Sequence, residues 1–170
     1  IKEANPERFR IIQSIAEELK GLKRKITSVK GRNIDDSRDT LIGLEGTAGR
    51  LYWDGVKEIL AHRAEFFGRQ TRGAIDPVNS LLNYGYGILY SIVWGALVNA
   101  GLEPFAGFLH VDRPGKPSLV LDLIEEFRQP VVDRVVIAYI NLGQDIKMTD
   151  GLLDADTRKI IGEKILARLE

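Results

Sequence analysis

Residues 101–128 read GLEPFAGFLHVDRPGKPSLVLDLIEEFR, and the rest of the chain is interpreted around this stretch. Glycine and proline recur through its first half, which predicts an irregular loop that carries one histidine, His110. From about residue 118 the apolar residues recur at helical spacing, which predicts a short amphipathic helix. Its acids stand at i, i+3 and i+4 and share the opposite side: Asp122, Glu125 and Glu126. A loop imidazole beside such carboxylates can hold one divalent ion, and the alternative is a solvated acidic face next to an ordinary histidine.

The composition is that of a folded globular protein with a substantial core. The chain has 170 residues, of which 44% are hydrophobic, and this length predicts a single domain, 1–170. It has no cysteine and two histidines, so thiolate metal sites are excluded and a metal site must rely on carboxylates. Such a site favours Mg²⁺ or Mn²⁺ over Zn²⁺. The formal net charge is zero, which argues against a protein that coats nucleic acid non-specifically but not against a local basic track.

One uncharged segment, residues 81–98 (LLNYGYGILYSIVWGALV), is long enough to resemble a membrane span. It contains Asn83, Ser91 and three glycines, and no basic cluster flanks it. A fully buried central helix is therefore the favoured interpretation. The chain opens on Ile1 and a charged, polar segment, which predicts a fragment of a longer protein without a signal peptide.

The first long helix is predicted over residues 5–30, with Asn5 as N-cap and Pro6 at the first helical position. Six cations and no acid follow in its second half and just beyond: Lys20, Lys23, Arg24, Lys25, Lys30 and Arg32. Such a run is either a solvated face or a contact for phosphates.

A second helix is predicted from residue 37 or 39 to residue 61, and Glu45 is its anomaly. Glu45 shares the apolar stripe of Leu41 and Ala48, so its carboxylate must find a cation, a metal or hydrogen-bond donors. The alternative to a ligand role is an internal salt bridge to an arginine. Three glycines surround Glu45 and suggest the close approach of another helix or a ligand: Gly43, Gly46 and Gly49.

The remaining helices are marked by local start and stop signals. A helix over residues 77–100 is predicted after Asp76 as N-cap, apolar nearly all round. Near its start, Asn79 and Asn83 are expected to satisfy backbone groups more often than to bind a ligand. Pro130 predicts a kink or restart of the acidic helix, and residues 131–140 are interpreted as helix rather than strand. Residues 143–150 are a predicted connector before a final helix over 156–169.

Three stretches, in the same order and at similar spacing, resemble one family. They are LIGLEGTAGRLYW (41–53), RGAIDPVNSLLNYGYGIL (72–89) and residues 101–136, in which GF-L-H, S-L-x-L-D-L-x-E-E-F-R and V-D-R form a long signature. They resemble the helical catalytic domain of the CRISPR-associated adaptation integrase, the first-numbered Cas protein. A weaker likeness over residues 148–169 extends the resemblance to nearly the whole chain.

The resemblance implies an all-α, multi-helix catalytic domain that acts on DNA with a bound Mn²⁺ or Mg²⁺. The ion would be held by Glu45 in the LEG motif, His110 and Glu125, with Asp122 as an auxiliary carboxylate at the rim. The implied DNA contacts are Arg72, Arg128, Lys23 and Arg24 along the phosphates, with Asn79 and Tyr86 shaping the pocket.

The implied reaction is the attack of a 3′-hydroxyl of a short duplex on a phosphodiester of the target DNA, which inserts a new spacer into the repeat array. It needs no ATP, in keeping with the absence of a GxxxxGK[ST] motif from the sequence. Family members are cytoplasmic proteins of prokaryotes. They carry an N-terminal β domain that builds a homodimer and binds a small ferredoxin-like partner, and this chain is expected to start after it. The alternatives are a non-catalytic helical module that binds DNA or protein, and a structural helical bundle.

Overall fold

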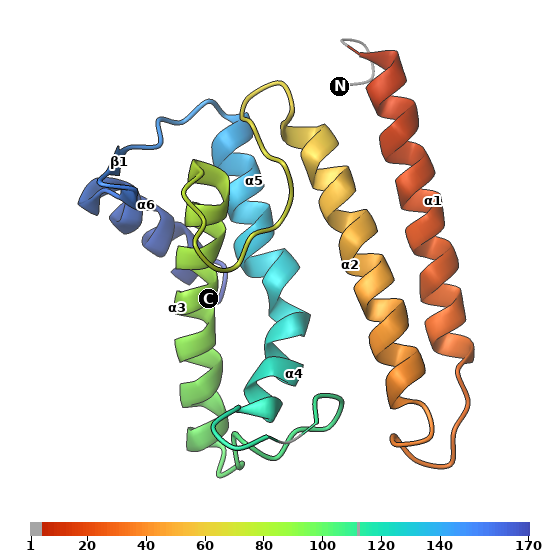
Figure 1. The fold of residues 1–170 in the computed structure, drawn as a ribbon. Helices are drawn as coiled ribbons and strands as arrows, with labels where there is room; N and C mark the ends of the chain where they lie inside the picture. Colours follow the sequence, from red (N-terminus) through yellow and green to blue (C-terminus); the bar gives the residue numbers. More distant parts are fainter. Residues whose placement is uncertain (1–4, 112) are drawn as a thin grey trace. The chain divides into compact units, whose positions relative to one another are not determined.

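The computed structural model describes residues 5–111 and 113–170. These residues form α-helices joined by loops, with one short π-helix and one two-stranded hairpin, as Figure 1 shows. The mainly helical class predicted from the sequence is confirmed in this coarse form. Internal contacts divide the chain into two compact units, Ile1–Arg69 (unit 1) and Gln70–Glu170 (unit 2), and each is described by itself. A single domain over 1–170 stays a prediction.

Unit 1 is a hairpin of two long antiparallel helices, α1 (Pro6–Ser28) and α2 (Arg38–Leu60) (Figure 1). α1 begins as predicted, because the Asn5 side chain accepts a hydrogen bond from the Arg8 backbone N–H at 2.9 Å. α1 has no fully buried residue, whereas α2 buries four, namely Leu51, Gly55, Val56 and Leu60. The basic run of α1 lies exposed.

Unit 2 is built around α3 (Pro77–Asn99), which contacts every other helix of the unit. These are α4 (Ser118–Phe127), the π-helix η1 (Arg128–Asp133), α5 (Arg134–Asn141) and α6 (Ala155–Leu166). Packing is close at Gly85, where an added Cβ would lie 2.6 Å from Val132 Cγ1 and 2.8 Å from Ile165 Cδ1. Glycine at this position therefore lets η1 and α6 approach the α3 backbone.

The central position of α3 is confirmed, but the prediction that it is fully buried is wrong. Its buried apolar residues recur at helical spacing along one side: Val78, Leu81, Leu82, Leu89, Val93 and Leu97. Gly87, Ser91 and Val98 lie exposed. By length and composition alone, α3 is also the described helix that could cross a membrane, and 33% of its most apolar window is buried.

The predicted interruption at Pro130 takes the form of the π-helical turn η1 between α4 and α5. Proline lacks the backbone N–H, so the regular i to i−4 ladder cannot continue through it. The helical interpretation of residues 131–140 is confirmed. Its β-branched run is explained by burial, since Val132 and Val136 are completely inaccessible.

A short hairpin, β1 (Met148–Thr149) paired with β2 (Leu152–Leu153), lies where the sequence predicts only a connector. Its two-residue turn holds Asp150 at φ 53° and Gly151 at φ 77°, the left-handed conformations that tight hairpins favour. Strands of two residues are too short to produce a visible alternation of apolar and polar side chains. The hairpin leads into α6, whose N-cap Asp154 accepts the Thr157 N–H at 2.7 Å.

Candidate metal centre

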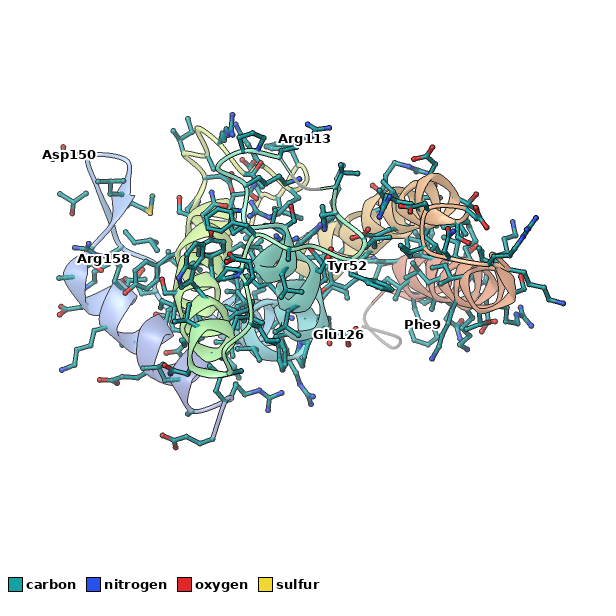
Figure 2. The ribbon with its side chains drawn as sticks, turned by 90° about the horizontal axis from the view of Figure 1, so that it is seen from below. Phe9, Tyr52, Arg113, Glu126, Asp150 and Arg158 are labelled. Atoms are coloured by element: carbon teal, nitrogen blue, oxygen red, sulfur yellow. The ribbon has the colours of Figure 1, made fainter. Side chains whose placement is uncertain are left out.

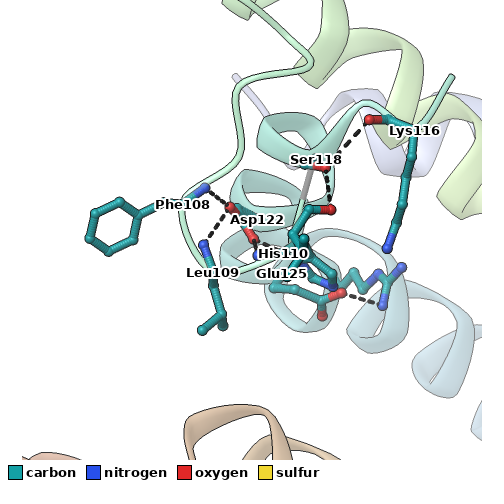
Figure 3. A network of polar contacts seen from close by, with 9 residues as sticks. Phe108, Leu109, His110, Lys116, Ser118, Asp122 and Glu125 are labelled. Carbon is teal, nitrogen blue, oxygen red and sulfur yellow. Dashed lines mark hydrogen bonds and ion pairs between the residues drawn. The ribbon is translucent and has the colours of Figure 1, made fainter. Parts of the chain in front are cut away.

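Asp122, on the second turn of α4, is the centre of a network that holds the His110 loop (Figure 3). Its Oδ2 accepts the backbone N–H of Phe108 at 2.5 Å and of Leu109 at 2.9 Å. Its Oδ1 accepts the backbone N–H of His110 at 2.9 Å. Three successive N–H groups thus converge on one carboxylate, as in other backbone anion sites. The loop is irregular, as predicted, but this carboxylate fixes its conformation.

The same carboxylate orients the His110 ring, whose Nδ1 lies 2.6 Å from Asp122 Oδ1. Burial raises the pKa of Asp122, but the backbone N–H groups of His110 and Phe108, the His110 ring and the Leu109 N–H together outweigh burial and leave this pKa below its ordinary value. An ionised carboxylate can only accept, so Nδ1 carries the proton. A neutral His110 therefore keeps its lone pair on Nε2, the tautomer that a metal-binding histidine of this kind adopts.

Ser118, at the start of α4, also holds the His110 loop against this helix and is completely buried. Its hydroxyl donates to the carbonyl oxygens of Val111 at 3.2 Å and Lys116 at 3.4 Å. The loop also passes very close to the helix at Gly107. A Cβ added to this glycine would lie 2.3 Å from Ser118 Cβ and 2.5 Å from the His110 carbonyl oxygen. The segment that carries His110 is therefore tied to α4 on both sides of the histidine.

Glu125 follows Asp122 by one turn, so the two carboxylates lie on the same side of α4. Its Oε1 forms an ion pair with Arg128 Nη1 at 2.5 Å. The Arg128 guanidinium lies 5.0 Å from the centroid of the Tyr86 ring, and the Tyr86 hydroxyl donates to Asp133. Asp133 is only 2% exposed. A chain of contacts thus runs from a buried carboxylate on η1 to Glu125.

Asp133 was not among the predicted site residues. The signal that could have indicated it is a single charged pair inside the apolar run VVDRVV, residues 131–136. A carboxylate at the buried face of such a run needs a hydrogen-bond donor from another element, and α3 provides Tyr86.

Glu45 lies half-buried on α2, on the side of Leu41 and Ala48, as predicted. Among the residues that the structure describes, its carboxylate has no ion pair or side-chain hydrogen bond, so the salt-bridge alternative finds no support. An added Cβ at any of the three neighbouring glycines would meet no atom within 4 Å. The prediction that another helix packs closely against them is therefore wrong within unit 1.

The predicted metal ligands come from both units: Glu45 from unit 1, and His110 and Glu125 from unit 2. Across residues 5–111 and 113–170, no three His, Asp or Glu side chains form a group that could hold a metal ion. Within unit 2, the structure places His110 against Asp122 and puts Glu125 on the next turn. The convergence of Glu45, His110 and Glu125 on one ion stays a prediction.

The predicted DNA contacts differ in accessibility. Lys23, Arg24 and Arg72 are exposed. Asn79 is 2% exposed, and its Oδ1 accepts the Gln70 N–H at 2.8 Å, so it holds the preceding loop as the backbone interpretation expects. The part that Asn79 plays in DNA binding stays a prediction.

Comparison with known proteins identifies the family. The model of the family described as CRISPR associated protein Cas1 matches residues 1–165. This chain belongs to the Cas1 family. The resemblance seen in the sequence is thereby confirmed.

Named Cas1 relatives extend the match beyond the family model. CRISPR-associated endonuclease Cas1 1 of Archaeoglobus fulgidus is 38% identical over 182 residues, which cover 99% of this chain and 52% of the relative. The protein of the same name from Saccharolobus solfataricus is 43% identical over 137 residues, which cover 79% of this chain and 37% of the relative. The present Cas1 chain thus spans about half, or less, of the length of these relatives.

Solved structures agree with the Cas1 assignment. A partial Cas6-RT-Cas1–Cas2 complex matches with a TM-score of 0.78 and 30% identity, covering 96% of this chain and 51% of that one. A casposase bound to integration product matches with a TM-score of 0.70 and 26% identity, covering 95% and 50%. A CAS1 protein from Thermotoga maritima shares the fold. It matches with a TM-score of 0.74 and 22% identity, covering 94% of this chain and 52% of that one.

Proposed function

We propose that this chain is the metal-binding catalytic part of a Cas1 endonuclease and integrase that acts on DNA. The observation that carries the proposal is the Asp122 network, which fixes the His110 loop and leaves the imidazole with its lone pair on Nε2. The endonuclease names of the relatives and the casposase bound to integration product support the same activity.

Glu45, His110 and Glu125 would hold one divalent ion. One imidazole nitrogen with two carboxylates suits Mn²⁺ somewhat better than Mg²⁺, which prefers oxygen alone. We assign Asp122 to positioning rather than to the auxiliary ligand role, because both of its oxygens already accept hydrogen bonds from the loop. When bound, the ion supplies Lewis-acid polarisation of the scissile phosphate and stabilises charge on the attacking or leaving oxygen.

The proposed reaction exchanges one phosphodiester for another. A 3′-oxygen of the incoming duplex loses its proton and bonds to a phosphorus of the target strand, while the bond from that phosphorus to a target 3′-oxygen breaks and the leaving oxygen gains a proton. One phosphodiester bond forms as another breaks, so the reaction needs no ATP. The exposed side chains of Lys23, Arg24 and Arg72 would hold the strands by their phosphates.

We extend the proposal to the assembly of the whole protein. A homodimer and a small CRISPR-associated partner fit the family, and the solved Cas6-RT-Cas1–Cas2 complex supports a Cas2 partner. Branched DNA and duplexes with free 3′ ends are the proposed substrates.

Manganese titration tests the metal site. We expect millimolar Mn²⁺ to raise the melting temperature of the wild-type chain. The double variant His110→Ala, Glu125→Ala should lose this rise. Glu126→Gln, which removes an exposed charge from the same helix, should keep it. Absence of a shift in the wild-type chain would contradict the proposal.

A non-catalytic DNA-binding module is the second candidate, and the exposed basic run of α1 favours it. Incubation of branched DNA with Mn²⁺ separates the two. The enzyme should yield cleaved product that Glu45→Ala abolishes. Binding without product, unchanged by Glu45→Ala, would establish the module.

A further inference from the structure

The His110 loop displays an aromatic ring in solvent. The side chain of Phe108 points away from the Asp122 network in Figure 3, and the residue is 65% exposed. Its backbone N–H is nevertheless held by Asp122 at 2.5 Å. A large apolar side chain kept in water on a fixed backbone is informative, because burial of such a ring is normally favourable.

Phe108 stands two residues before His110, at most about 7 Å along the backbone. Successive nucleotides of one strand rise by about 3.4 Å along the axis of a duplex. A strand whose phosphodiester reaches the His110 imidazole therefore brings its neighbouring nucleotides within reach of the Phe108 ring. Aromatic side chains on which successive bases stack are one of the features by which proteins bind single-stranded nucleic acid.

We propose that Phe108 is a stacking platform for an unpaired base next to the reacting phosphodiester. This inference rests on the proposed function, because it takes His110 as the place where the DNA reacts. The base must be unpaired, since inside a duplex both faces of a base are already covered by its neighbours. Stacking on a ring is tolerant of sequence, so the platform recognises the unpaired state and not a particular base.

The backbone contacts explain why the platform can work. A ring on a mobile loop would lose conformational entropy when it binds, whereas the Asp122 and Ser118 contacts have already fixed this loop. Val111, which follows His110 in the sequence, is also exposed, at 51%.

The test uses a duplex with a 2-aminopurine in a single-stranded 3′ end, and a blunt duplex for comparison, both with EDTA. Wild-type chain should quench the 2-aminopurine and prefer the overhang. Phe108→Leu should lose the quenching and bind the overhang about tenfold more weakly, with blunt-end binding unchanged. Phe108→Trp should restore both. The matched control Phe67→Leu changes a phenylalanine that is 85% exposed and should have no effect.

The inference is overturned if Phe108→Leu binds the overhang and quenches like wild type, or weakens both duplexes equally, or if wild type shows no preference for the overhang. Cleavage of branched DNA by the wild-type chain with Mn²⁺ is measured separately. Product formation together with an unaffected Phe108→Leu rejects the platform alone, whereas absence of product rejects the proposed function.

Discussion

His110 Nδ1 and Asp122 Oδ1 lie 2.6 Å apart, although the two residues are twelve positions apart along the chain. The same carboxylate accepts the backbone N–H groups of residues 108–110. One side chain therefore sets both the path of the loop and the tautomer of the histidine. The Asp122 side chain is 12% exposed and the His110 side chain is 26% exposed. The imidazole is therefore positioned by a carboxylate that is more buried than the ring itself.

Asp122→Asn should disturb the tautomer with little change in shape. The amide NH₂ can donate to Nδ1, which would then accept and shift the proton to Nε2. We expect the Mn²⁺ affinity to fall roughly 10- to 100-fold. Calorimetry measures the affinity, and ¹⁵N NMR of the metal-free chain reports which ring nitrogen is protonated. Glu126→Gln is the matched control, and an unchanged tautomer in Asp122→Asn would contradict the assignment.

Acid should weaken the fold through Asp122. Its pKa in the folded chain lies below the ordinary value of 3.8, so the ionised carboxylate stabilises the native state. This contribution is complete above the ordinary pKa and is lost as the pH falls through the lower, folded pKa. Urea unfolding measured at several pH values from about 2.5 to about 6 tests this. The free energy of unfolding of the wild-type chain should fall more steeply with decreasing pH than that of Asp122→Asn. Parallel curves would refute the role of this carboxylate.

Gly107→Ala should displace the His110 loop from α4. Its new Cβ would lie 2.3 Å from Ser118 Cβ and 2.5 Å from a backbone oxygen, so the loop must move at a cost of about 1–3 kcal/mol. Gly87→Ala is the control, since its Cβ meets no atom within 4 Å on the exposed side of α3. That control should stabilise the helix by up to about 1 kcal/mol. Chemical denaturation measures both, and equal stability of the two variants would be the contrary result.

Tyr86→Phe should destabilise unit 2 because it removes the hydroxyl that donates to the buried Asp133. Hydrogen bonds to charged groups contribute about 1.5–3 kcal/mol, so a loss of this size is expected in the free energy of unfolding. Tyr90→Phe, one turn further along α3, is the comparison and should cost less than about 0.5 kcal/mol. Similar losses in the two variants would argue against the Asp133 contact.

Lys23 and Arg24 should contribute to DNA binding through charge alone. Replacing both with serine should reduce the salt dependence of the binding constant by up to about 1.8 in slope, if each contacts one phosphate. Fluorescence anisotropy from low to high salt measures the slope. Lys159→Ser with Lys164→Ser removes the same charge from exposed positions on α6 and should leave the slope unchanged.

The sequence by itself determined the helix starts and the candidate residues. Asn5 and Asp76 each precede a proline and cap a helix as predicted, because capping involves only residues within one turn. Helical spacing likewise placed Asp122 and Glu125 on one face of α4. These features depend on local backbone preferences, which neighbouring residues carry with them.

Only the tertiary structure decided what those residues do. Spacing treats Asp122 and Glu125 alike, yet Asp122 meets three backbone N–H groups from 12 to 14 residues away, whereas Glu125 meets Arg128 one turn on. Asp133 finds Tyr86 47 residues distant. The role of a carboxylate depends on which hydrogen-bond donors folding brings within about 3 Å of it. The local periodicity of the sequence does not predict which distant donors these are.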